Sequence, residues 1–144
     1  ENSVEFLGWV LPEQVPGLIN TTTMVVMPSR WEGHPLVAVQ ASLMARPFVG
    51  TPVGGLREVV LPEETGLLVE QENPGAISDG IMTLLADHDA ASEMGHKARQ
   101  RSQEIFSWEA CVNAYDSLYR DLHEKSAKHL KSPGVPPVTP PEVR

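Results

Sequence analysis

The stretch that decides the fold is MPSRWEGHPLVAVQA, residues 27–41. A short apolar run, 23–27, leads into it, while a helical pattern to about residue 45 and a second apolar run, 47–50, follow it. The order is therefore strand, loop, helix, strand. Two strands joined by a crossover of this length lie parallel in one sheet. We expect an α/β fold.

The loop in the middle of this unit has the features of a ligand site. Pro35 suits the first helical position, because its missing N–H would be unpaired there in any case. The free N–H groups of that helix start point back at the loop and attract anions. Glu32 lies at the mouth of the loop, and Gln40 lies about two helical turns further on. This arrangement suits a ligand that carries both hydroxyl groups and phosphates.

Each side chain of the loop also has a plainer interpretation. Glu32 can be an ordinary exposed acid, and Gln40 a partly buried helix glutamine. Arg30 is more often a surface residue than a phosphate clamp. Trp31 is expected to pack the loop rather than stack on a base, and His34 to be a loop residue rather than a proton shuttle.

Further elements surround this unit. The predicted strands are 4–8, 23–27, 47–51 and 65–69, with 23–27 covered on both faces. Helices are predicted over 11–20 (short, or split at Pro16-Gly17), from Pro35 to about 45, from Pro74 with Asn73 as cap, over 89–104, and from Ser107 to about 125. The second helix is expected to turn five side chains to the sheet: Leu36, Val37, Val39, Leu43 and Met44.

Alternating strands and helices indicate a Rossmann-like parallel sheet with flanking helices. In such sheets ligands bind beyond the carboxyl ends of the strands. The loops at Gly8, 28–34 and 51–55 each follow a predicted strand, so all three are expected at that edge. The pair Gly54-Gly55 fits a tight turn and a ligand loop equally well.

Composition bounds the remaining possibilities. The 144 residues fit one domain, 1–125, followed by a disordered Pro-rich tail, 126–144. No apolar run approaches the roughly 18 residues of a membrane span, and no signal peptide is visible. The net charge of −8 argues against nucleic-acid binding. The five histidines and Cys111 do not have metal-ligand spacing, so we expect no metal site.

At this point the chain resembles a known family. Residues 28–41 look like the donor-site signature of the retaining glycosyltransferases of the GT-B fold, family 4 (group 1 glycosyltransferases). Four further segments agree with the family in order, namely 4–8, 51–60, 65–69 and 106–109, so the resemblance covers about residues 4–124. It implies an enzyme that transfers a sugar from a nucleotide-diphosphate donor to an acceptor with retention at the anomeric carbon, without a metal or cofactor.

The resemblance also implies roles for individual residues. Glu32 matches the first acid of the family's Glu-x7-Glu pattern, which contacts hydroxyls of the donor sugar, and is the expected catalytic residue. Gln40 stands where the family has its second acid, which binds ribose hydroxyls. A glutamine can hydrogen-bond a diol but carries no charge, so the donor would lose one charge-assisted bond, worth about 1 kcal/mol of binding free energy. The residues expected to bind the donor are Trp9, Val10, Ser29, Arg30, Glu32, Gly33, His34, Leu36, Val37 and Gln40. Among them, Trp9 and Val10 are expected to line the pocket for the nucleotide base.

Family members also carry an N-terminal domain for the acceptor, and their donor domain opens with a strand and a loop that bears an Arg and a Lys. This chain resembles only the later part of the C-terminal domain, so we expect it to be inactive alone. The acceptor would be a glycan, a lipid or a small molecule. The complete enzyme would be cytoplasmic and could associate peripherally with a membrane.

Two alternatives stay open. Gln40 is compatible with a non-catalytic sugar-nucleotide-binding or partner subunit. A flavodoxin-like switch would need an acidic cluster at the strand ends, and none stands at Gly8, Pro28 or Thr51.

Overall fold

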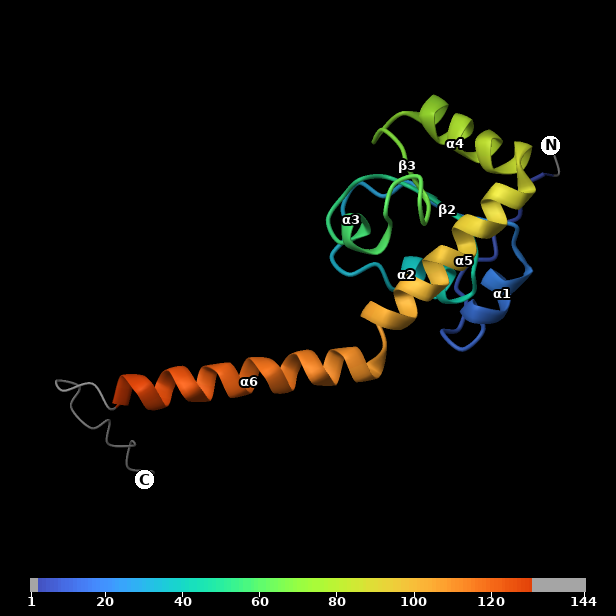
Figure 1. Ribbon diagram of the computed structural model, residues 1–144. Coiled ribbons are helices and arrows are strands. Elements are labelled where there is room, and N and C mark those ends of the chain that lie inside the picture. The colour runs from blue at the N-terminus through green and yellow to red at the C-terminus, as the bar shows by residue number, and fades with distance from the viewer. Residues whose placement is uncertain (1–2, 131–144) are drawn as a thin grey trace, which may run out of the picture. The chain divides into compact units, whose positions relative to one another are not determined.

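The computed structural model describes residues 3–130 (Figure 1). The chain divides into two compact units, Glu1–Phe106 and Ser107–Arg144. The first unit contains α1 (Val15–Thr21), β1 (Val25–Met27), α2 (Leu36–Leu43), β2 (Phe48–Gly50), α3 (Leu56–Val59), β3 (Leu67–Leu68), α4 (Pro74–Ala86) and α5 (His88–Ile105). The second unit contains α6 (Trp108–Leu130). The predicted α/β class is confirmed.

The sheet of the first unit is parallel throughout and has the order β1-β2-β3. Val25 lies opposite Phe48, and Val49 lies opposite Leu67. The predicted strand at 4–8 is wrong, because this segment is not a strand and none of the described strands pairs with it. Phe6 of this segment is 94% exposed.

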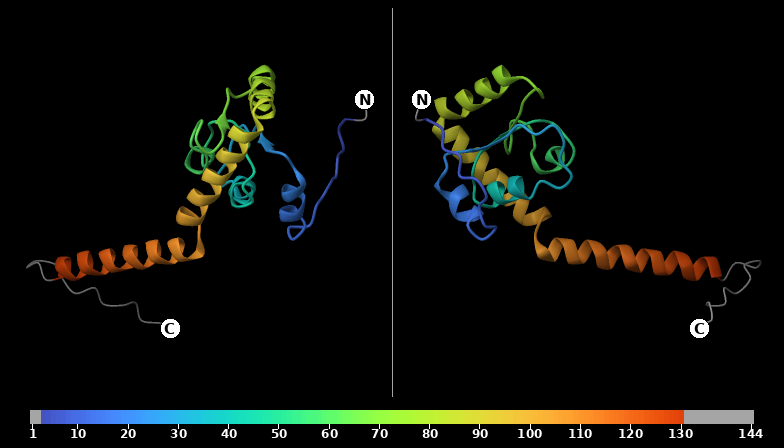
Figure 2. Two further views of the ribbon diagram at one scale, coloured as in Figure 1. Left: turned by 45° about the vertical axis from the view of Figure 1, so that its right-hand side comes forward. Right: turned by 180° about the vertical axis from the view of Figure 1, so that it is seen from behind.

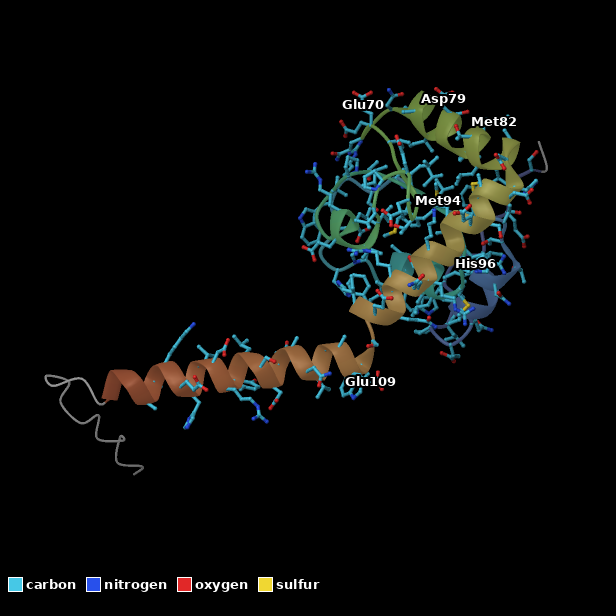
Figure 3. All side chains as sticks on the ribbon, viewed as in Figure 1. Glu70, Asp79, Met82, Met94, His96 and Glu109 are labelled. Carbon is cyan, nitrogen blue, oxygen red and sulfur yellow. The ribbon has the colours of Figure 1, made fainter. Side chains whose placement is uncertain are left out.

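Helices cover both faces of the central strand β2 (Figure 2). Successive strand residues point to opposite faces. Phe48 therefore belongs to one apolar cluster, with Val39 of α2 and Leu56 of α3, and Val49 belongs to a second cluster, with Leu84 of α4. Met94 of α5, labelled in Figure 3, packs against that second cluster.

The strand β1 is less covered than predicted. Val26 is 36% exposed, although 23–27 was expected to be buried on both faces. Val26 pairs with Val49 and so faces the same side as the second cluster. The packing of α4 and α5 centres on β2 and β3, and β1 lies at the end of the described sheet.

The buried face of α2 also differs from the prediction. Ala38 and Ala41 are fully buried, whereas Leu36 and Val37 are 65% and 41% exposed. The reason is the close approach of α5, which contacts α2. A Cβ at Gly95 of α5 would lie 2.3 Å from the carbonyl oxygen of Ala45. Large side chains therefore do not fit the contact, and small ones occupy it. Leu43, also predicted for the sheet face, is 37% exposed.

The helix ends follow their local sequence closely. Asn73 caps α4, since its Oδ1 accepts a hydrogen bond from the N–H of Ala76 at 3.0 Å, as predicted. Asp87 caps α5 in the same way. Pro16 lies in the first turn of α1 and does not split that helix, because proline needs no N–H partner there.

The second unit consists of α6 in the described part of the chain. Ser107 caps it, because its Oγ accepts a hydrogen bond from the N–H of Ala110 at 3.1 Å, and Glu109 lies in its first turn (Figure 3). Five large apolar or aromatic side chains of α6 are exposed, namely Val112, Tyr115, Leu118, Tyr119 and Leu122. The helix continues to Leu130, past the predicted start of the tail at 126. Residues 131–144 of that predicted tail lie outside the described residues.

Within residues 3–130, no helix combines the length and the apolar character that a membrane crossing requires.

Candidate functional site

Three loops that follow the three parallel strands meet around residues 28–35. They are the β1–α2 loop (28–35), the β2–α3 loop (51–55) and the β3–α4 loop (69–73). Parallel strands place their carboxyl ends at one edge, so the meeting of these loops follows from the topology. The predicted gathering of 28–34 and 51–55 is therefore present, while the loop at Gly8 follows no strand.

The carboxylate of Glu32 is held by its own loop. The Ser29 hydroxyl donates a hydrogen bond of 2.7 Å to Oε1 of Glu32. Both residues are half-buried. A bond between a hydroxyl and an ionised acceptor is among the stronger hydrogen bonds in proteins. It leaves the second carboxylate oxygen available to accept bonds from a ligand.

Both neighbouring loops bind the backbone of the β1–α2 loop. The buried Thr51 hydroxyl donates to the carbonyl of Ser29, and the Gln71 side-chain amide donates to the carbonyl of Arg30 at 3.0 Å. The N–H of Gly55 donates to the carbonyl of Glu32 at 3.2 Å. Carbonyls on both sides of Trp31 are thus fixed from outside the loop.

The two adjacent glycines of the β2–α3 loop are required by this contact. A Cβ at Gly54 would lie 1.8 Å from the carbonyl oxygen of Glu32, and Gly54 has a φ of +42°. A Cβ at Gly55 would lie 2.1 Å from the carbonyl oxygen of Gly33 and 2.9 Å from Cδ of Pro35. The two glycines therefore allow the β2–α3 loop to pack against the backbone of the β1–α2 loop. The sequence left a tight turn and a ligand loop open, and this packing is the role that the structure shows.

The start of α2 offers free donors to this loop. Pro35 is the N-cap, one position before the predicted place. The N–H of Leu36 donates to the carbonyl of His34 at 3.0 Å, and the N–H of Val39 to Pro35. The described hydrogen bonds include no acceptor for the N–H groups of Gly33, His34 and Val37. These donors, together with the helix dipole, favour an anion at this end.

Arg30 is held in an ion pair by the β3–α4 loop. Its Nε lies 2.9 Å from Oε1 of Glu72, and the two side chains are 81% and 63% exposed. Gln71 and Glu72 therefore hold the backbone and the side chain of the same arginine. Neither residue is predicted from the sequence, because both lie 41 or more positions from Arg30 and belong to no recognisable motif.

The remaining predicted residues of this loop differ in their surroundings. Trp31 is 79% exposed, so the prediction that it packs the loop is wrong for most of its surface. His34 is exposed, and its ring centroid lies 5.8 Å from that of Phe106, just after α5. Gln40 is half-buried, in agreement with its plainer interpretation. Leu36 and Val37, as described above, face outward at the helix start.

Trp9 and Val10 belong to the segment that precedes α1. They line a shallow apolar hollow with Leu18 and other residues of α1. In Figures 1 and 2 the N-terminal segment runs beside α1, while the β1–α2 loop lies beside α3 on the other side of the unit. The structure therefore brings together Ser29, Arg30, Glu32 and the start of α2. The hollow that Trp9 and Val10 line includes no residue of the β1–α2 loop, and their place at the nucleotide base stays a prediction.

A further ion pair, between Lys97 and Glu93, lies on α5. The hydrogen bond from Lys97 and its positive charge lower the pKa of Glu93, and Glu93 in turn raises the pKa of Lys97. Across residues 3–130 the structure contains no cluster of three histidine, cysteine or acidic side chains that could hold a metal ion.

A parallel sheet with flanking helices and with loops gathered at its carboxyl edge gives the first unit a Rossmann-like architecture. The family model described as "Glycosyl transferases group 1" matches residues 1–87. The chain therefore belongs to the group 1 glycosyltransferases.

Individual relatives agree with this family. The chain is 35% identical over 121 residues to a D-inositol 3-phosphate glycosyltransferase of Corynebacterium glutamicum, covering 84% of this chain and 29% of that protein. A solved sucrose-phosphate synthase of Thermosynechococcus elongatus superposes with a TM-score of 0.76 at 36% identity, over 84% of this chain and 30% of that one.

The fold is also that of Anabaena HepE, solved in complex with UDP-glucose, which superposes with a TM-score of 0.71 at 23% identity over 86% of this chain and 33% of that one. The chain spans about a third of the length of the curated relatives it matches. The predicted GT-B fold and the resemblance to group 1 glycosyltransferases are confirmed.

Proposed function

We propose that this chain is the donor-binding part of a glycosyltransferase that moves a sugar from a nucleotide-diphosphate-sugar to an acceptor, with retention at the anomeric carbon. One observation carries the proposal: the Glu32 carboxylate, held by Ser29 at 2.7 Å, stands next to the free N–H groups at the start of α2. A carboxylate accepts bonds from sugar hydroxyls, and a helix start binds phosphate. A sugar diphosphate presents both groups together.

In this proposal the chain's own groups have distinct tasks. The N–H groups of Gly33, His34 and Val37 bind the diphosphate and stabilise the charge that develops as it leaves. Glu32 orients the donor sugar through its hydroxyls, which places the anomeric carbon for transfer. Gln40 binds ribose hydroxyls as a neutral donor and acceptor. No metal or cofactor takes part, so EDTA should leave donor affinity unchanged.

The acceptor site and the complete reaction belong to parts beyond this chain in the proposal, since the curated relatives are about three times as long. The acceptor is a glycan, a lipid or a small molecule bound by an N-terminal domain of a cytoplasmic parent, which can associate peripherally with a membrane. The 144 residues alone should therefore bind a donor without transferring its sugar. Measurable transfer by the isolated chain would contradict this part.

Isothermal titration calorimetry of the chain with UDP and UDP-glucose tests the donor site. UDP-glucose is the probe because it is the ligand in the HepE structure. In Glu32→Gln, loss of charge-assisted bonds should weaken UDP-glucose binding by about tenfold to a hundredfold and leave UDP binding unchanged. The exposed Glu124→Gln on α6 is the matched control. Equal loss for UDP and UDP-glucose would contradict a role for Glu32 at the sugar.

A non-catalytic binding subunit is the second candidate, and Gln40 favours it because it replaces the acid expected there. In the intact parent, Gln40→Glu should raise turnover if the site is catalytic. Unchanged turnover would favour the binding subunit.

A further inference from the structure

Three carbonyls of the β1–α2 loop are bound by groups from the two neighbouring loops. Thr51 binds the carbonyl of Ser29, Gln71 binds that of Arg30, and the N–H of Gly55 binds that of Glu32. Two of these bonds come from side chains, so a substitution at Thr51 or Gln71 can remove each of them. The loop has no regular secondary structure of its own over 28–34, and its conformation depends on such external bonds.

We propose that Thr51 and Gln71 are positioning residues for Glu32, and that they act by fixing the backbone carbonyls of Ser29 and Arg30. This inference rests on the proposed donor-binding function. Ser29 holds the Glu32 carboxylate through a single bond of 2.7 Å, so the carboxylate moves whenever the backbone of Ser29 moves. Neither Thr51 nor Gln71 needs to touch the ligand for this effect.

The two residues differ in a useful way. Thr51 is fully buried, so its hydroxyl also satisfies a polar group in the interior, and its loss can affect folding. Gln71 is exposed, and its one described hydrogen bond is the 3.0 Å bond to Arg30. A change at Gln71 therefore reports on loop position with little effect on the core.

The variants Thr51→Val and Gln71→Leu remove the two donors at nearly constant shape. Each should raise the Kd of the chain for UDP-glucose by about threefold to tenfold, the effect of losing one hydrogen bond. Thr51→Ser keeps the hydroxyl and should restore affinity. Thr83→Val and Gln100→Leu are matched controls, because both side chains make exposed bonds within their own helices, α4 and α5, and should leave the Kd unchanged.

A double-mutant cycle separates positioning from a merely structural role. If Gln71 acts through Glu32, Gln71→Leu should have little effect on UDP-glucose affinity in a chain that already carries Glu32→Gln. The same fold-loss in both backgrounds would overturn the inference, and so would wild-type affinity in Gln71→Leu.

Ligand-free NMR keeps the inference testable if the proposed function fails. Should the wild-type chain not bind UDP-glucose at millimolar concentration, the donor-site proposal falls, but the amide shifts of 29–33 still report on the loop. Both variants should shift these amides and the side-chain carboxyl resonance of Glu32, while the two control variants should not. Unchanged resonances in a folded Gln71→Leu chain would overturn the inference.

Discussion

Gly55→Ala is the substitution that isolates the seating of the β2–α3 loop against the β1–α2 loop. Gly55 has φ −64° and ψ −12°, which alanine adopts without strain. Its N–H and α3 can therefore keep their conformation. The added Cβ would meet the carbonyl oxygen of Gly33 at 2.1 Å, where an ordinary contact of carbon and oxygen is about 3.3 Å. The two loops must separate by roughly 1 Å.

That displacement has a predicted cost in binding. A misplacement of about 1 Å near a reacting group can reduce rates by about a hundredfold, and a binding site whose donors shift by the same distance loses much of its hydrogen bonding. We expect the affinity of the chain for UDP-glucose to fall by at least about tenfold. The helical content should stay at the wild-type level, because α3 itself accepts alanine.

Calorimetry with UDP-glucose measures the affinity, and circular dichroism measures the fold. Gly17→Ala in α1 is the matched control, since an added Cβ there meets nothing within 4 Å. It should leave affinity unchanged and stabilise the chain by up to about 1 kcal/mol. Wild-type affinity in Gly55→Ala would refute the reasoning that loop seating positions the donor site.

Three further substitutions test the packing, the capping and the charges. Leu84 is 3% exposed, and Leu84→Ala should lower the free energy of unfolding by about 2–5 kcal/mol in urea titrations. Leu85 is 41% exposed, and Leu85→Ala should lower it much less. Equal losses would contradict the packing of Leu84 in the second cluster. Asn73→Ala should lower it by about 1 kcal/mol through loss of the α4 cap, and an unchanged melting temperature would argue against that cap. Glu72→Gln should free Arg30 and tighten UDP binding by about twofold to fivefold at low salt. The free energy of unfolding should change little, because exposed ion pairs are weak. Unchanged affinity at low salt would place Arg30 away from the diphosphate.

The sequence predicts those features that depend on neighbouring residues. The cap at Asn73 and the strand predicted at 47–51 both follow from short-range rules, and both are present, the latter as β2. The strand at 4–8 fails for the opposite reason. A strand needs a partner to pair with, and an apolar segment alone does not supply one.

The face of α2 illustrates a second limit. Leu36 and Val37 have the hydrophobicity expected of core positions, but the close crossing of α5 selects Ala38 and Ala41 instead. Hydrophobic periodicity does not reveal how near a neighbouring helix will come.

The candidate site shows the same division. Glu32 and the helix start are visible in one continuous motif, and the structure places them together with Ser29. Gln71 and Glu72 reach the loop through the parallel topology, from positions that carry no pattern of their own. Only the meeting of three strand ends at one edge could have suggested that such residues exist.

The most direct test of the donor site is a backbone-amide NMR titration of the chain with UDP-glucose. We expect the largest shifts at the N–H groups of residues 32–34, 36 and 37, with smaller shifts at 71–72, where the neighbouring loop holds Arg30. Shifts confined to α5 or α6, or none at millimolar UDP-glucose, would contradict the assignment of the donor site to the start of α2.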